Sequence, residues 1–159
     1  MRSSAMRSIA ILDAGPLLAS FDRRDPDHRA SAAVLLRRDL DFVVPALVVA
    51  EVAHLIGERL GQAPEAAFIR SLTKFEVEVP TVGEWPVMAD LVTRYADFPL
   101  GAIDAATIVL ADRLGTDLIV TLDRRHFGAV LSPQGRRFRL LPEQVAVHEE
   151  PATYDPAPS

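Results

Sequence analysis

The sequence predicts an α/β fold with a mostly parallel, five-stranded sheet flanked by helices on both faces. Five short runs rich in apolar and β-branched residues alternate with segments whose apolar residues recur at helical spacing. The run at 118–122 is short and apolar, as in strands buried on both faces of a parallel sheet. With 159 residues, 49% of them hydrophobic, the chain is long enough for one domain with its own core.

The elements follow in order from local patterns. After Ile9 to Leu12 comes the turn Asp-Ala-Gly-Pro, in which Gly15 loosens the turn and Pro16 suits the first position of a helix. Gly115 ends the helix that Asp104 opens. The predicted strands are 9–12, 42–44, 75–79, 118–122 and 138–141; the predicted helices are 16–21, 27–38, 45–60, 64–74, 83–96 and 104–114; 128–137 is a loop. The predicted domain spans 9–148, after a flexible extension at 1–8 and before a disordered tail at 149–159.

Four acids occupy notable positions in this arrangement. Asp13 and Asp123 directly follow strands, and in open parallel sheets ligands bind beyond the carboxyl ends of the strands. Asp104 lies at the start of a helix. Glu51 lies in the middle of an apolar arc of helix 45–60, where a carboxylate is costly unless it is paired or binds a cation.

Each acid also has an ordinary structural interpretation. Asp13 is a suitable helix cap, Asp104 is an acid favoured in a first helical turn, and Asp123 is a common turn residue. Glu51 has the weakest alternatives, a salt bridge to a residue such as Arg59 or a helix face that is not buried. These interpretations hold for single residues, whereas four clustered carboxylates require a neutralising cation because like charges raise one another's pKa.

The composition restricts the chemistry of the site. The chain has no cysteine and its four histidines form no ligand spacing, so carboxylates remain as ligands and favour Mg²⁺ or Mn²⁺ over zinc. Mg²⁺ held by carboxylates commonly serves phosphate-ester chemistry, in which it activates a water and stabilises the leaving oxygen. The histidines are interpreted as surface or satisfied core residues, and Trp85 and Phe98 as core residues.

The charge distribution limits the binding partners. A net charge of −5 argues against a broad cationic surface for nucleic acid, so RNA binding needs a local basic group. Arg124, Arg125 and His126 directly follow Asp123 and are expected to flank the site. No signal-peptide pattern or run of about 18 apolar residues is present, so the predicted location is the cytoplasm, without membrane contact.

Three segments carry a family resemblance: ILDAGPLLASFDRRDPDH, VPALVVAEVAHLI and PLGAIDAATIVLADRLGTDLIVTLDRRHF. They resemble the signature segments of PIN-domain ribonucleases, especially the VapC-type toxins of bacterial type II toxin–antitoxin systems, over about Ile9 to Leu141. The resemblance implies a PIN-like three-layer sandwich around the five-stranded sheet. It also implies a Mg²⁺- or Mn²⁺-dependent endoribonuclease that uses a metal-activated water and leaves 5′-phosphate and 3′-hydroxyl ends.

The resemblance also implies roles for individual residues. The family's four acids, catalytic and metal-binding, correspond to Asp13, Glu51, Asp104 and Asp123. Thr121 corresponds to a hydroxyl residue near the metal and is grouped with Arg124 and Arg125 as contacts to the RNA substrate.

The implied partner is a cognate antitoxin protein that inserts a basic side chain among the acids. The apolar helix 64–74 is either a homodimer face or part of the core. A non-catalytic PIN-like interaction module and a PIN nuclease outside toxin–antitoxin systems remain as alternatives. An aspartate-nucleophile phosphatase is disfavoured because Gly15 stands where its second acid is expected, and a nucleotide-binding domain because the glycine-rich phosphate motifs are absent. A DNA-acting nuclease is disfavoured because the chain is compact and acidic.

Overall fold

The computed structural model describes residues 6–144, and its centre is a five-stranded sheet in which every strand pair is parallel. The strand order is β3-β2-β1-β4-β5. The strands are β1 (Ser8–Leu12), β2 (Leu40–Pro45), β3 (Glu76–Glu78), β4 (Leu118–Val120) and β5 (Arg139–Leu141). The predicted fold class is thus confirmed. The predicted tail 149–159 and most of the predicted extension 1–8 lie outside the described residues, while Ser8 begins β1.

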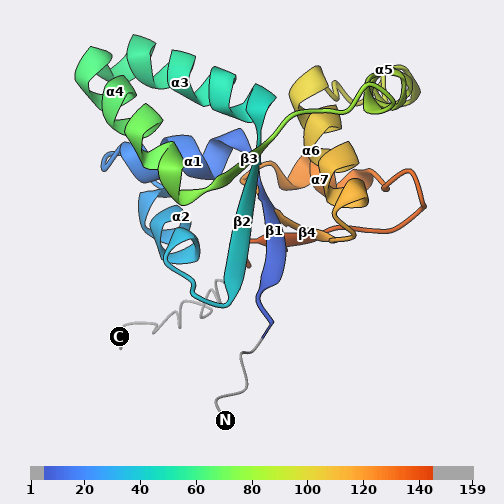
Figure 1. Cartoon of the computed structure of the whole chain (residues 1–159), viewed down its shortest axis with the longest axis horizontal. Helices are drawn as coiled ribbons and strands as arrows, with labels where there is room; N and C mark the ends of the chain where they lie inside the picture. Colours follow the sequence, from blue (N-terminus) through green and yellow to red (C-terminus); the bar gives the residue numbers. More distant parts are fainter. Residues whose placement is uncertain (1–5, 145–159) are drawn as a thin grey trace, which may run out of the picture.

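Helices cover both faces of the sheet (Figure 1). One side carries the first four helices and the other carries the last three. The helices are α1 (Ala14–Phe21), α2 (His28–Leu35), α3 (Ala46–Leu60), α4 (Gln62–Ser71), α5 (Glu84–Arg94), α6 (Ala102–Arg113) and α7 (Arg124–Ala129), with a 3₁₀ turn, η1, at Leu72–Lys74. None of the helices in residues 6–144 is long and apolar enough to cross a membrane.

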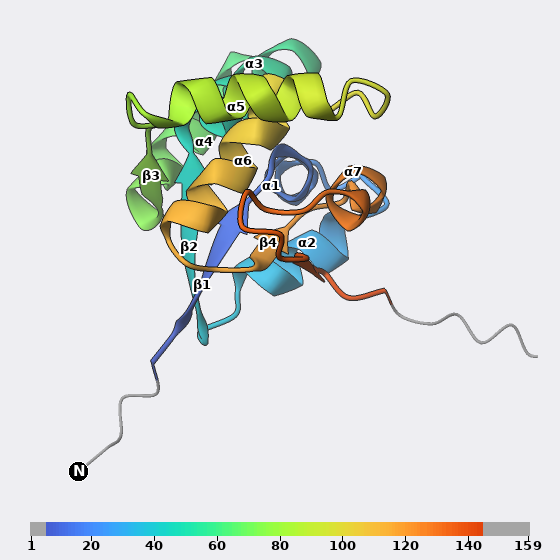
Figure 2. The same cartoon turned by 90° about the vertical axis from the view of Figure 1, so that its right-hand side faces the viewer.

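Alternation along the strands divides the core between the two faces, because successive side chains of a strand point to opposite sides. Ala10 and Leu12 of β1 pack in the cluster shared with α1 to α4, whose centre includes the fully buried Phe68 of α4. Ile11, from the same strand, packs instead with residues of α6. Helix α6 is therefore the inner helix of its layer, and α5 crosses its outer side (Figure 2).

Helix α5 is anchored on α6 by two buried side chains, Met88 and Leu91. Two aromatic residues in this region depart from the prediction. Trp85 is 47% exposed and Phe98 is 38% exposed, so the interpretation of both as core residues is wrong. The reason is that α5 is the outer helix on this side of the sheet and packs mainly against α6 (Figure 2).

The largest error in the predicted elements concerns α7, which the sequence interpretation missed and partly assigned to the loop 128–137. The helix has six residues and buries only Phe127. The start of α1 also differs, because the helix begins at Ala14 and Pro16 is its third residue. Proline is tolerated there because the amides of the first helical turn have no partner within the helix.

Candidate functional site

An open cleft lies at the carboxyl ends of β1 and β4, the two central neighbours in the sheet. The chain runs outward from β1 to β2 and β3, and then returns to the other side of β1 with β4. Such a reversal of strand order leaves a crevice in which parallel sheets bind ligands. The lining residues are Asp13, Ala14, Gly15, Glu51, Gly101, Ala102, Ile103, Asp104, Leu122, Asp123, Arg124, Arg125 and Gln144. The four predicted acids are therefore brought to one cleft.

Asp13 lies at the base of the cleft and is 7% exposed. Its amide donates a hydrogen bond to the Val120 carbonyl at 2.9 Å, which joins the end of β1 to β4. The residue occupies the N-cap position of α1, yet its side chain makes no capping hydrogen bond. The pKa of Asp13 is raised to about 6, mainly by burial and also by the charges of Asp104 and Glu51. Hydrogen bonds from Thr121 and from the Ala14 amide stabilise the charged form and oppose this rise.

Thr121 supports Asp13 from below the cleft. Its side chain is fully buried, and its hydroxyl donates to Asp13 Oδ2 at 2.7 Å while accepting from the Asp123 amide at 2.9 Å. Thr121 is absent from the cleft lining. The hydroxyl predicted to lie near the metal and the substrate is thus placed where it orients the acids.

Asp104 is the third residue of α6, and its Oδ2 accepts a hydrogen bond from the Gly101 amide at 3.0 Å. Asp104 is therefore both a first-turn acid of its helix and a residue of the cleft. Burial raises the pKa of Asp104, and the charge of Asp123 adds to the rise, whereas the hydrogen bond from Gly101 and the proximity of His126 oppose it.

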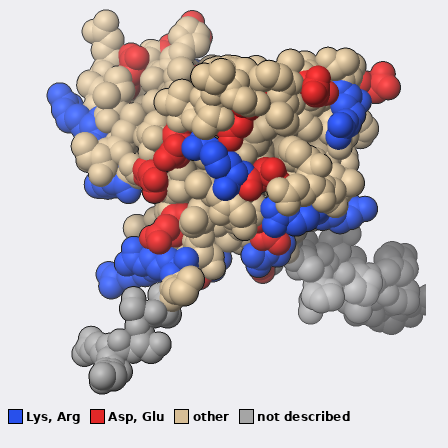
Figure 3. Space-filling view, turned by 45° about the vertical axis from the view of Figure 1, so that its right-hand side comes forward, with Lys and Arg blue, Asp and Glu red and all other residues tan. Residues whose placement is uncertain are grey.

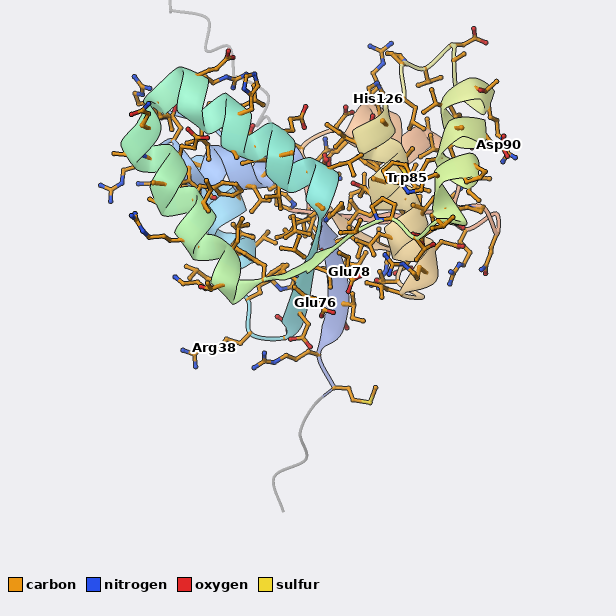
Figure 4. The ribbon with its side chains drawn as sticks, turned by 45° about the horizontal axis from the view of Figure 1, so that its top comes forward. Arg38, Glu76, Glu78, Trp85, Asp90 and His126 are labelled. Carbon is orange, nitrogen blue, oxygen red and sulfur yellow. The ribbon has the colours of Figure 1, made fainter. Side chains whose placement is uncertain are left out.

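Asp123 caps α7 and is held by one residue, His126. The His126 amide donates to Asp123 Oδ1 at 2.9 Å, and the ring Nδ1 lies 2.8 Å from Asp123 Oδ2. The same Nδ1 lies 3.8 Å from Oδ2 of Asp104. The His126 side chain is 19% exposed and stands beside the first turn of α6 (Figure 4).

Glu51 reaches the cleft from the second turn of α3 and is half-buried. The suggested salt bridge to Arg59 is not formed, and Glu51 has no ion pair with a basic side chain of residues 6–144. The charge of Glu51 contributes to the raised pKa of Asp13. An unpaired carboxylate facing other carboxylates is consistent with a site that attracts a cation.

The two arginines after Asp123 differ in their environment. The Arg124 guanidinium donates to the carbonyl of Pro142, just beyond β5, which ties this side chain to the cleft wall. Arg125 is exposed at the rim and has no ion pair within the described part of the chain. Arg125 is therefore the freer of the two to meet an anion that enters the cleft.

The donor set fits a hard cation by its chemistry. Four carboxylates line one cleft, and Mg²⁺ prefers oxygen ligands, of which the protein commonly supplies one or two while waters and substrate phosphates complete the shell. Among residues 6–144, however, no three Asp, Glu, His or Cys side chains are arranged so that they could hold a metal ion together.

Known proteins resemble this chain in sequence and in fold. The model of the PIN domain family matches residues 10–130. The chain belongs to the PIN-domain family. A relative, ribonuclease VapC26 of Mycobacterium tuberculosis (strain ATCC 25618 / H37Rv), is 41% identical over 134 residues, which make up 83% of this chain and 99% of the relative. The predicted family and the likeness to VapC proteins are confirmed.

Solved structures of PIN-domain proteins share this fold. VapC20 of Mycobacterium tuberculosis, described as a sarcin–ricin loop cleaving toxin, superposes with a TM-score of 0.67 at 18% identity, covering 76% of this chain and 96% of VapC20. VapBC2 from Rickettsia felis, bound to a promoter DNA fragment, gives a TM-score of 0.62 at 13% identity over 83% of this chain and 98% of that one. These structures confirm the PIN-like α/β architecture.

His126 is the residue of the PIN-domain site that the sequence interpretation missed. It was expected to flank the site but was grouped with surface or satisfied core histidines. The available signal was its spacing: Asp123 is a good N-cap, and the third residue after an N-cap has its amide within reach of the capping side chain. This spacing has meaning only if residues 124–129 form a helix, and α7 was not predicted.

Proposed function

We propose that this PIN-domain protein is a Mg²⁺- or Mn²⁺-dependent endoribonuclease that acts as the toxin of a toxin–antitoxin pair. The observation that carries the proposal is the meeting of four carboxylates in one cleft, where burial raises the pKa of Asp13 to about 6. The relative that covers most of the chain is a ribonuclease, VapC26. Hydrolysis of RNA phosphodiesters agrees both with the acidic cleft of this chain and with the name of the relative.

Asp13 and Asp104 would hold the principal cation, because both line the cleft and burial raises the pKa of both. Glu51 and Asp123 would complete the site directly or through water. A cation held there would supply positive charge that lowers the pKa of a water and stabilises the leaving oxygen. Thr121 keeps Asp13 in place, and the Arg125 guanidinium at the rim offers a phosphate contact.

A cognate antitoxin is the proposed protein partner. VapBC2 from Rickettsia felis, VapBC-1 from nontypeable Haemophilus influenzae and FitAcB from Neisseria gonorrhoeae share the fold. An acidic cleft attracts a basic side chain, and such a side chain would occupy the place of the cation. Antitoxin binding and metal binding should therefore compete at Asp13 and Asp104.

A homodimer is also proposed. Helix α4, named from the sequence as a dimer face, buries Phe68 in the core and exposes Ile69. More exposed apolar residues are found together after β3, at Val79 and Val82 of the connection to α5 and at Trp85 in the first turn of α5. Light scattering should give the mass of two chains for the native protein and of one chain for Trp85→Glu, with Leu36→Glu, at another exposed apolar position, as the control.

The decisive experiment is RNA cleavage by the purified chain, freed of any partner, in Mg²⁺, in Mn²⁺ and in EDTA. Asp13→Asn and Asp104→Asn should abolish cleavage while the variants stay folded, whereas Asp90→Asn, an exposed acid of α5, should not (Figure 4). Products should carry 5′-phosphates, and 2′-deoxy substitution at the scissile nucleotide should not prevent cutting. Metal-independent cutting, or cutting that Asp13→Asn and Asp104→Asn retain, would contradict the mechanism. Failure to cut any RNA would favour a non-catalytic interaction module.

A further inference from the structure

We propose that His126 is a positioning residue that fixes the orientation of Asp123 and its separation from Asp104, so that the cleft can accept a cation. This role rests on the proposed metal-dependent function and assigns a task to a residue of α7. His126 contacts both oxygens of the Asp123 carboxylate: the amide donates a hydrogen bond to Oδ1 at 2.9 Å, and the ring Nδ1 lies 2.8 Å from Oδ2. The torsions of a carboxylate held at two points by one residue are restricted.

The direction of the ring contact follows from the chemistry of the two groups. An ionised carboxylate only accepts hydrogen bonds, so a hydrogen bond at this contact requires a proton on Nδ1 of His126. The neutral ring with its proton on Nδ1 already satisfies this requirement. The orientation of Asp123 therefore needs a donor at the δ position of residue 126, and it does not need a charged ring.

The same ring lies close to both acids. Nδ1 lies 2.8 Å from Oδ2 of Asp123 and 3.8 Å from Oδ2 of Asp104, too far for a hydrogen bond to the second acid. Asp104 Oδ2 accepts instead from the Gly101 amide. Each acid is thus held within the first turn of its own helix, and Nδ1 of the imidazole lies within 4 Å of both carboxylates.

A packing role for His126 would give different results. Phe127, the neighbouring residue, is 1% exposed and anchors α7 in the core, so the helix has an apolar attachment of its own. By contrast, 40% of the Asp123 side chain is exposed to the cleft, and nothing in the described chain other than His126 donates a hydrogen bond to its carboxylate. Removal of the donor should free Asp123 while α7 stays in place.

The test measures Mn²⁺ binding to the purified full-length chain without RNA, by electron paramagnetic resonance, beside thermal unfolding in EDTA. His126→Ala and His126→Phe should weaken Mn²⁺ binding about 10- to 100-fold, the range typical for loss of an outer hydrogen-bond partner of a metal ligand. His126→Asn should bind within about threefold of the native chain, because its amide nitrogen branches from Cγ as Nδ1 does in histidine. His54→Ala, which alters an exposed histidine of α3, should match the native chain.

The three substitutions separate a hydrogen-bonding role from a packing role. His126→Phe keeps a ring and loses the donor, so native-like Mn²⁺ affinity in this variant would overturn the proposal. Loss of affinity in His126→Asn equal to that in His126→Ala would also overturn it. If the native chain binds no Mn²⁺, the proposed function fails together with this role, whereas native binding that Asp104→Asn loses and His126→Ala retains refutes only the role of His126.

Discussion

Asp13 is the most deeply buried acid of the cleft, and its raised pKa links stability to pH. The pKa is about 6 in the folded chain against an ordinary value of 3.8, so the folded state holds the proton more tightly than the unfolded state. Without metal, stability should be greatest below about pH 4, fall as the pH rises towards 6, and stay constant above that. A difference of this size corresponds to roughly 3 kcal/mol, at about 1.4 kcal/mol per pH unit.

Urea unfolding in EDTA between pH 4 and pH 8 measures this slope. Asp13→Asn keeps an acceptor for Thr121 and carries no charge, so it should unfold at higher urea than the native chain at pH 8, and its slope should be shallower. The variant Asp90→Asn should keep the native slope, because this acid is exposed on α5. An equal slope in Asp13→Asn and the native chain would show that another group titrates.

Thr121 connects two acids through one hydroxyl, so Thr121→Val should affect both. The valine leaves Asp13 Oδ2 and the Asp123 amide without their partner, which should lower the free energy of unfolding by about 1–3 kcal/mol and reduce cleavage of RNA. Thr121→Ser keeps the hydroxyl, so this variant should retain most of the stability and most of the RNA cleavage. Urea midpoints and cleavage rates measure the two effects.

Thr107 provides the matched control for this substitution, because it is also a fully buried threonine. Its hydroxyl donates to the Ile103 carbonyl at 3.1 Å, a group that already accepts a hydrogen bond within α6. Thr107→Val should therefore cost less stability than Thr121→Val and leave cleavage unchanged. The opposite order would show that the hydroxyl of Thr121 does not support the acids.

Two helical glycines test how closely elements approach the cleft. A Cβ on Gly15 of α1 would lie 3.3 Å from Leu122 Cβ, whereas one on Gly128 of α7 would meet nothing within 4 Å. Neither glycine has a positive φ, so backbone strain does not enter. Gly128→Ala should stabilise the chain by up to about 1 kcal/mol through helix propensity. Gly15→Ala should not increase stability in this way, because its methyl group would lie too close to Leu122.

The reason is that Leu122 Cβ is fixed to the backbone between Thr121 and Asp123, so it cannot rotate away. The added methyl of Gly15→Ala should displace α1 or the chain after β4, and RNA cleavage should fall more than stability does. Thermal unfolding and cleavage of both alanine variants measure the contrast. Equal gains in stability and unchanged cleavage in both would show that the contact at Leu122 is not restrictive.

Most elements could be predicted because their residues alternate or repeat over enough positions. The run at 118–122 is predicted as a strand and contains β4, and helix 45–60 corresponds to α3. Helix α7 could not be found in this way, since six residues span fewer than two turns and only Phe127 is buried. The exposure of Trp85 was also hidden, because periodicity does not show how many layers a helix packs against.

At the scale of the whole molecule, strand order decides which acids meet. The sequence indicated that Asp13 and Asp123 follow strands, and this was enough to place both at the same edge of a parallel sheet. The adjacency of β1 and β4 was not predicted, because local patterns carry no information on strand order, and it is known from the structure. The hydrogen bonds of Thr121 and His126 depend on that adjacency and on α7, so they were visible only in the structure.

The charge of the whole chain predicts weak salt dependence of RNA binding. The net charge is −5, and basic groups stand apart from one another, with acidic groups among them, on the face shown in Figure 3. Among residues 6–144, Arg124 and Arg125 are the only basic residues that line the cleft. For two phosphate contacts to a single strand, the logarithm of the binding constant should fall with the logarithm of salt concentration with a slope of about −1 to −2.

Fluorescence anisotropy with the cleavage-deficient Asp104→Asn chain measures this slope without loss of the RNA. Arg125→Ala should make the slope shallower by about 0.7, the contribution of one phosphate contact. Arg38→Ala should leave it unchanged, because Arg38 precedes β2 at the end of the sheet opposite the cleft (Figure 4). A slope steeper than about −4 would mean that RNA contacts a basic surface beyond the cleft, such as one assembled from two chains.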